Sequence, residues 1–161
     1  MNVEQFWKLF LQQHHKDESL QFLESFHFDV TKESANHLLA LVLSGKKQAT
    51  ASSLLVYNND IIMPKVGDYS IVCDWEGNPH CIIETTNITI LPYKEITYDI
   101  CKREGEDDTL ESWQENHKRF FTVEGKEMGY SFSEEMPVVF EDFKVVFKLQ
   151  TIEELYPSED C

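Results

Sequence analysis

Lys47 and Thr50 lie three residues apart, just beyond the glycine that closes an apolar helical pattern. An amine beside a hydroxyl is a candidate base and nucleophile, because the amine can take up the proton that the hydroxyl loses on attack. A second interpretation needs no chemistry. Lysines at the end of a helix interact favourably with its negative dipole, and Thr50 then belongs to an ordinary strand. The local pattern leaves both interpretations open.

An acidic cluster lies more than fifty residues downstream and is the densest in the chain. It consists of Glu104, Glu106, Asp107 and Asp108. In one interpretation this segment presents a carboxylate at a cleft. In the other it is a solvated loop in which Asp108 or Thr109 caps the next helix.

Three aromatic residues at helical spacing follow this cluster: Trp113, His117 and Phe120. Trp113 and Phe120 fit core positions better than they fit a platform for stacking nucleobases. His117 comes four residues after Trp113, so it lies on or beside the same buried face. That position is typical of an interior histidine whose ring nitrogens are hydrogen-bonded.

Composition restricts the classes of function. Fourteen Lys and Arg residues against twenty-nine Asp and Glu residues give a formal charge of −15, which opposes a broad nucleic-acid surface. The four cysteines, Cys73, Cys81, Cys101 and Cys161, have no CxxC motif and no ligand-like spacing, so we expect no zinc, no other metal and no cofactor. No stretch resembles a signal peptide or a membrane span, and we expect a cytoplasmic protein without a membrane partner.

Apolar periodicity and turn residues predict the elements that must position these side chains. Thr31 fits the N-cap of a helix that starts near residue 32, and Gly45 fits the left-handed position just past its end. Further helices are expected over 2–13, 18–25 and 95–103 and from residue 110, and strands over 51–57, 69–75, 80–91 and 137–149. Short strands with interspersed helices indicate an α+β fold built on a small β-barrel with flanking helices.

The length of 161 residues fits one domain. We expect a helical N-terminal extension over 1–25 that packs on the domain, the domain itself over 26–150, and an acidic tail over 151–161. The sequence does not distinguish a monomer from a dimer.

The stretch over 41–52, Leu-Val-Leu-Ser-Gly-Lys-Lys-Gln-Ala-Thr-Ala-Ser, resembles the signature of the ASCH domain family in its bacterial single-domain form. This family has a PUA-like β-barrel fold. Later segments agree in the same order, so the resemblance covers 26–149. They are Val66 to Tyr69, Glu104 to Asp108 with Leu110 and Trp113, His117 with Phe120 and Phe121, and Met136 to Glu141 with Phe143. Asp107 stands where similar bacterial members have a glycine, so we expect the acidic loop to differ in backbone shape.

The resemblance implies work on nucleosides or RNA. One bacterial ASCH branch hydrolyses the acetyl amide of N4-acetylcytidine with a lysine, a threonine three residues later and a glutamate, which correspond to Lys47, Thr50 and Glu104. In that mechanism Lys47 acts as the base for Thr50. The remaining candidate substrate-binding residues are Gly45, Lys46, Ser52, Arg103, Glu106, Trp113 and His117.

Three hypotheses therefore stand after the sequence analysis. The first is amide hydrolysis of an acylated nucleoside in a cleft shared by Lys47 and Glu104. The second is RNA cleavage, with phosphates tracked by Lys46, Lys47, Arg103 and Arg119. The third is an RNA-binding or regulatory module without catalysis. The partner is a small-molecule nucleoside or single-stranded RNA, and the acidic balance of the chain favours the nucleoside.

Overall fold

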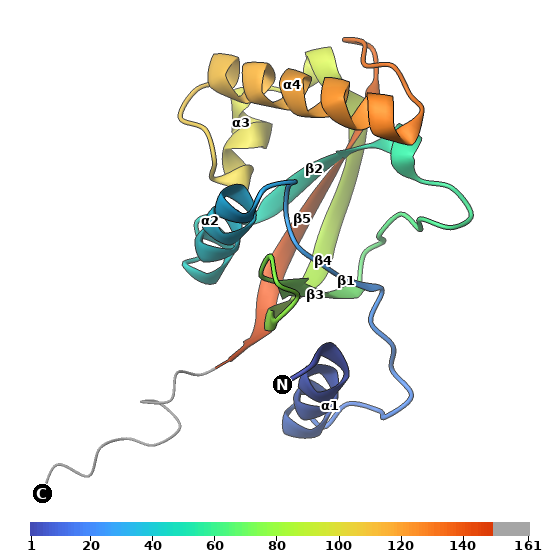
Figure 1. The fold of residues 1–161 in the computed structure, drawn as a ribbon, viewed down its shortest axis with the longest axis vertical. Helices are drawn as coiled ribbons and strands as arrows, with labels where there is room; N and C mark the ends of the chain where they lie inside the picture. Colours follow the sequence, from blue (N-terminus) through green and yellow to red (C-terminus); the bar gives the residue numbers. More distant parts are fainter. Residues whose placement is uncertain (150–161) are drawn as a thin grey trace, which may run out of the picture.

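A mixed five-stranded sheet forms the centre of the fold, with strand order β1-β3-β4-β5-β2. The computed structural model describes residues 1–149. The strands are β1 (Glu24–Phe26), β2 (Ala49–Ser53), β3 (Tyr69–Cys73), β4 (Pro79–Pro92) and β5 (Pro137–Lys148). Within this described part of the chain, only β1 and β3 pair in parallel. The long strands β4 and β5 curl the sheet into a half-barrel (Figure 1), which confirms the expected α+β class.

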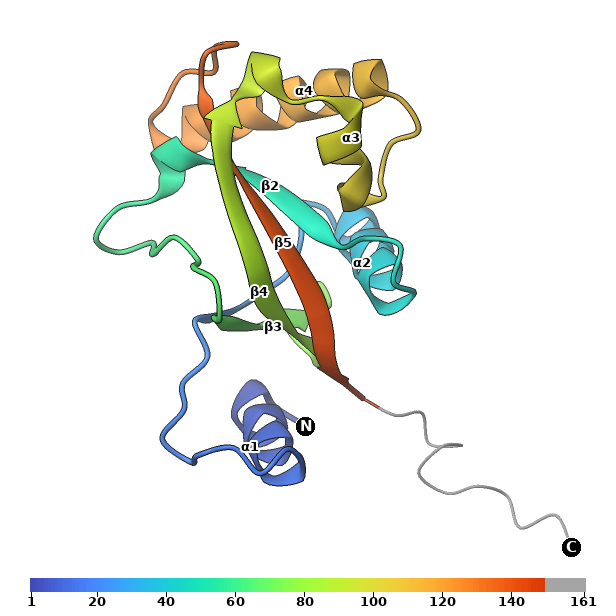
Figure 2. The ribbon, with the colours of Figure 1, turned by 180° about the vertical axis from the view of Figure 1, so that it is seen from behind.

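Four helices surround the sheet: α1 (Val3–Gln13), α2 (Lys32–Leu43), α3 (Tyr98–Cys101) and α4 (Leu110–Met128). Figures 1 and 2 show α1 at one end of the sheet and α4 across the other end. Alternating strand residues serve different helices. Ile71 and Ile82 pack against α1, whereas Val72 and Ile83 pack in the cluster that holds α2. Among residues 1–149, no helix combines the length and the apolar character that crossing a bilayer requires.

Helix α2 and the turn after it form as the sequence predicts. The Thr31 hydroxyl accepts a hydrogen bond from the backbone N–H of Ser34 at 3.2 Å, which caps the helix. Gly45 adopts a positive φ of 82°. The backbone N–H groups of Lys46 and Lys47 then both donate to the carbonyl of Leu41 at 3.0 Å. These bonds cap the C-terminus of the helix before β2 begins.

The helix expected over 18–25 is wrong, because this segment begins with a turn at residues 18–19, continues without regular structure and enters β1 at Glu24. The Trp7 indole N–H donates to the Leu20 carbonyl at 2.9 Å, and the Leu23 N–H donates to the Tyr69 carbonyl at 2.7 Å. Leu20 and Phe22 reach the apolar cluster of α1 from this segment. Tertiary partners therefore replace the local bonds of a helix.

Other boundaries also differ from the expectations; for example, the strand expected over 69–75 ends at Cys73. The helix expected over 95–103 is reduced to α3, flanked by short 3-10 turns at Tyr93–Glu95 and Lys102–Glu104. The strand expected over 51–57 begins at Ala49 and passes into a 3-10 turn at Leu54–Val56. The proposed boundary between residues 25 and 26 falls inside β1. The expected acidic tail lies outside the described residues.

Replacement of Phe6 should show how much α1 contributes to the stability of the domain. The Phe6 ring is fully buried, with its centroid 5.1 Å from that of Phe147. We expect Phe6→Ala to lower the free energy of unfolding by about 3–5 kcal/mol in urea denaturation. Lys8→Ala, at an exposed position of the same helix, should change it by less than about 0.5 kcal/mol. Equal effects of the two substitutions would show that α1 is not part of the cooperative unit.

Candidate functional site

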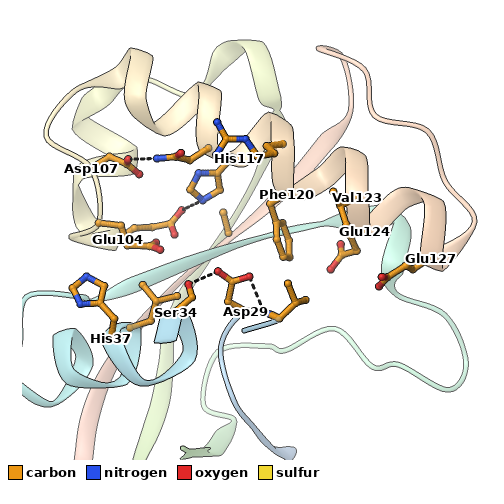
Figure 3. Close-up of a pocket in the computed structure, with 16 residues that line it drawn as sticks. Asp29, Ser34, His37, Glu104, Asp107, His117, Phe120, Val123, Glu124 and Glu127 are labelled. Atoms are coloured by element: carbon orange, nitrogen blue, oxygen red, sulfur yellow. Dashed lines mark hydrogen bonds and ion pairs between the residues drawn. The ribbon is translucent and has the colours of Figure 1, made fainter. Parts of the chain in front are cut away.

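A cavity of about 500 Å³ opens between α2 and α4, beside β2. Leu38 of α2, Ala51 of β2 and Phe120 of α4 give it apolar walls. Figure 3 shows Glu104 and His117 at one end of this cavity and Glu124 and Glu127 at the other. The end that holds Glu104 leads into a buried cluster of charged side chains.

Lys47 is the centre of that cluster. Its side chain is only 1% exposed. Its ammonium nitrogen donates to the Ala49 carbonyl at 2.9 Å, to Glu106 Oε2 at 2.9 Å and to Glu104 Oε2 at 3.3 Å. An ammonium group has three N–H donors, so every donor has an acceptor. This arrangement suits a charged ammonium, and it leaves Lys47 no lone pair with which to accept a proton.

Glu104 is held as a carboxylate by three donors. Its Oε1 accepts from the Trp113 indole N–H at 3.0 Å and lies 3.3 Å from His117 Nε2, while Oε2 accepts from Lys47. Burial by itself would raise the pKa of Glu104. The charges of Lys47 and His117 outweigh burial and hold the pKa well below its usual value.

Glu106 is the other carboxylate on Lys47, and its environment differs from that of Glu104. Burial and the adjacent Glu104 raise the pKa of Glu106 to about 8, against the opposing charge of Lys47. His117 completes the cluster, with its ring stacked on Trp113 at 4.1 Å between centroids. Its Nδ1 lies 2.9 Å from the Trp113 carbonyl and its Nε2 faces Glu104, so both ring nitrogens meet acceptors. Burial opposes the charged imidazolium, but Glu104 outweighs it and raises the pKa of His117.

Backbone contacts bring the two halves of the cluster together across 57 positions of sequence. The Gln48 N–H donates to the Arg103 carbonyl at 2.9 Å. Gly105 has a φ of +70°, and a Cβ atom at this position would lie 2.3 Å from the Lys46 carbonyl oxygen. Only glycine fits a positive φ at so close an approach.

The predicted site residues separate into two groups. Glu104, Glu106 and His117 line the cavity. Lys47 is not among the lining residues but donates hydrogen bonds to both glutamates. Gly45, Lys46, Thr50, Ser52, Arg103 and Trp113 are not among the lining residues.

The residues outside the lining have other partners. Arg103 pairs with Asp142 at 3.0 Å, and the Ser52 hydroxyl bonds to that of Tyr57 at 2.7 Å. Trp113 is fully buried and contributes by orienting Glu104. Thr50 lies on the face of β2 opposite Ala51, because side chains alternate along a strand. Its hydroxyl forms no hydrogen bond within residues 1–149.

Sequence reasoning missed several lining residues, including Asp29, Ser34, His37, Asn116 and Glu127. The Ser34 hydroxyl donates to Asp29, and the Asn116 amide donates to Asp107 at 2.8 Å. His37 carried a weak signal, since it is a polar residue inside an apolar helix. The others belong to loops or to exposed helix faces, where no periodicity identifies a cavity wall.

One group in the described part of the chain has the residue types of a metal site. Ligand atoms of Glu104, Glu106 and His117 lie within 4.8 Å of one another. The single ammonium charge of Lys47 already lies 3.3 Å from Glu104 and 2.9 Å from Glu106. A divalent cation would have to compete with this ammonium charge, so the arrangement suits an ion-pair network better than a metal centre.

Substitution of Gly105 should disrupt the cluster without touching a charged group. We expect Gly105→Ala to lose at least twice the stability that Gly77→Ala loses. Gly77 has a similar φ of +90° but no atom within 4 Å of an added Cβ, so it should show only the left-handed strain of about 1–2 kcal/mol. Thermal unfolding of both variants measures the difference. Similar losses would mean that the approach to Lys46 costs nothing.

The pH dependence of stability should identify Glu106. Its pKa is raised from an ordinary 4.5 to about 8 on folding, so its contribution is present below pH ~4.5 and is lost as pH rises through ~8. Within this window the free energy of unfolding should fall with rising pH more steeply in wild type than in Glu106→Gln, by up to about 1.4 kcal/mol per pH unit. Urea titrations at several pH values provide the comparison. Parallel curves for the two proteins would contradict the assignment.

Comparison with known proteins identifies the family to which the chain belongs. A sequence model described as the ASCH domain matches residues 24–147. The crystal structure of an ASCH domain from Lactobacillus crispatus JV V101 is 35% identical, with a TM-score of 0.81 over 89% of this chain and 92% of that one. Protein EF3133 from Enterococcus faecalis V583 is 34% identical, with a TM-score of 0.83 over 93% and 95%. A search of curated proteins found no match. The chain therefore belongs to the ASCH domain family and has its PUA-like fold.

Proposed function

We propose that the cavity binds a small nucleoside and that the Lys47 cluster hydrolyses an acyl amide on its base, with an N4-acetylcytidine-like compound as substrate. The observation that carries this proposal is the buried ion pair of Lys47 and Glu104 at the inner end of the cavity. Burying these charges is costly, and perturbed charged groups beside a cavity are typical of functional sites.

The size and charge of the cavity support a nucleoside over an RNA chain. A volume of about 500 Å³ is typical of small-ligand sites. Its carboxylate-bearing lining residues are Asp29, Glu104, Glu106, Asp107, Glu124 and Glu127, whereas Arg119 is its single Lys or Arg. This acidic lining repels a phosphate backbone. Of the residues expected to track RNA phosphates, Arg103 is paired with Asp142 and Lys46 lies outside the lining.

The walls of the cavity suit a flat base with one polar edge. Leu38, Ala51 and Phe120 offer apolar contact, while Glu104, Glu106 and His117 offer hydrogen-bonding groups at one end. Small-molecule sites commonly combine apolar walls with a few converging polar groups. In this orientation the exocyclic acyl group of the base lies toward Lys47.

Lys47 serves in this proposal as a donor and not as the base that the resemblance implies. All its N–H groups already donate, so it can stabilise an oxyanion when the acyl oxygen replaces one of its acceptors. Thr50 lies on the face of β2 opposite Ala51, which lines the cavity, so the proposed nucleophile is a water molecule in the cavity. The neighbouring hydroxyls are already engaged, because that of Ser52 bonds to Tyr57 and that of Ser53 accepts from the Leu55 N–H.

Acetate release from N4-acetylcytidine by the purified protein tests this function. We expect turnover without added metal, and a loss of ~10²–10⁴-fold in kcat/KM for Lys47→Met. Thr50→Val, on the face of β2 away from the cavity, should stay within about twofold of wild type. Glu104→Gln should reduce activity less, if it only orients Lys47. Lys118→Met, at an exposed position on α4, is the charge-matched control and should stay within about twofold of wild type. Thermal unfolding checks that each variant is folded.

The outcomes separate the alternatives. If wild type binds cytidine but shows no turnover, the protein is a nucleoside-binding module without hydrolytic activity. A large loss of activity in a folded Thr50→Val variant would assign the nucleophile to Thr50 and contradict a water nucleophile. Full activity in Lys47→Met would show that the Lys47 cluster has no role in the reaction.

A further inference from the structure

We propose that Glu106 is the proton-transfer residue of this site, taking the proton of the attacking hydroxyl and passing it to the departing nitrogen. This inference rests on the proposed amide hydrolysis and extends it, because neither the resemblance nor the sequence pattern gives Glu106 a catalytic role. It follows from the different surroundings of Glu104 and Glu106, which both contact Lys47.

Glu104 has no capacity left for proton transfer. Its two oxygens accept from Trp113 and Lys47 and face His117. The side chain is 2% exposed. A carboxylate with three donors fixed around it is a permanent anion. It holds the cluster together, and it cannot reach a substrate without breaking those contacts.

Glu106 has the opposite properties. Its Oε2 accepts a hydrogen bond from Lys47, and in its protonated form Glu106 also shares a hydrogen bond with Glu104. Its side chain is 20% exposed and lines the cavity. In the carboxylate form one oxygen stays on Lys47, and the hydrogen bond to Glu104 is lost, so the other oxygen can accept from a ligand. A general base must lie within hydrogen-bonding reach of the proton that it accepts, and Glu106 is the member of the cluster placed to do so.

The charges around Glu106 make it a stronger base than an ordinary carboxylate. Burial and Glu104 raise its pKa to about 8, while Lys47 opposes the rise. The other titratable or charged groups that face this end of the cavity are His117 and Arg119 of α4, Asp107 of the acidic loop and His37 of α2. Two carboxylates whose environments separate their pKa values are the usual sign of distinct acid–base roles.

The proton balance closes without any further reactant. Glu106 takes the hydroxyl proton as the oxygen bonds to the amide carbon and the carbonyl electron pair moves onto oxygen. When the C–N bond breaks, its electron pair stays on nitrogen, which takes that proton from Glu106. The hydroxyl belongs to water, so the acyl product is acetic acid. Glu106 is a carboxylate again at the end.

The pH dependence of kcat/KM tests this role. Because the carboxylate is the active form, kcat/KM of wild type should rise by on the order of 100-fold between pH 6 and pH 9 and level off above pH ~8. Glu106→Gln keeps an oxygen for Lys47 but cannot carry the proton. We expect it to lose ~10²–10⁴-fold and to lose the rise with pH. The uncatalysed rate is subtracted at each pH.

Three controls make the result specific. Glu104 raises the pKa of His117, so the assignment depends on the difference between wild type and Glu106→Gln. Glu111→Gln, at an exposed position on α4, should retain both rate and profile. Glu106→Asp keeps a carboxylate and should retain the rise with pH at a lower rate, which a purely structural role would not predict.

Each outcome supports or overturns the proposal. A flat profile in wild type, or an unchanged rise in Glu106→Gln, overturns the role of Glu106. If Lys47→Met is inactive at the same time, amide hydrolysis itself still stands. No turnover by wild type at any pH overturns both. Should Glu106→Gln fail to fold, a flat profile in Glu106→Asp overturns the inference by itself.

Discussion

The ammonium of Lys47, held in the interior by two carboxylates and a carbonyl, is the interaction on which the site depends. An isolated buried charge is too costly to persist, so its partners must be supplied by the fold. The Gly45 turn delivers Lys47, and the turn after α3 delivers Glu104. Helix α4 adds Trp113 and His117. Removing one partner of such a pair typically costs about 3–5 kcal/mol, because the other charge stays buried.

Glu104 and Glu106, which are separated by one residue, differ in pKa in opposite directions because the chain turns between them. Gly105 adopts a left-handed conformation there. Glu104 then points toward the indole N–H of Trp113, and Glu106 stays at the cavity edge with Lys47. A difference of pKa between neighbours in sequence therefore comes from their surroundings and not from their residue type.

Much of this arrangement could be predicted from sequence, and the reasons for the rest are physical. The caps of α2, the glycine after it and the long strands follow from local rules, because their partners lie within a few residues. The proximity of Lys47 to Glu104 came through the family resemblance, since no local rule joins residues 57 apart. β1 was missed because Leu20, Leu23 and Phe26 fit a helical period as well as an extended segment. The face on which Thr50 lies, and the exposure that separates Glu106 from Glu104, depend on where β2 and the acidic loop sit in three dimensions.

The join between the two halves of the site consists of main-chain atoms: the Gln48 N–H on the Arg103 carbonyl, and Gly105 against the Lys46 carbonyl. Every residue type has a main-chain carbonyl, and every type except proline has a main-chain N–H. Positions 46 and 103 can therefore vary without disturbing the join, and position 48 can vary to any residue but proline. Position 105 cannot, because its constraint is the absence of a side chain. Tolerance to substitution therefore differs sharply between neighbouring positions of this region. The surface charge around the cavity can vary while the buried lysine stays the same.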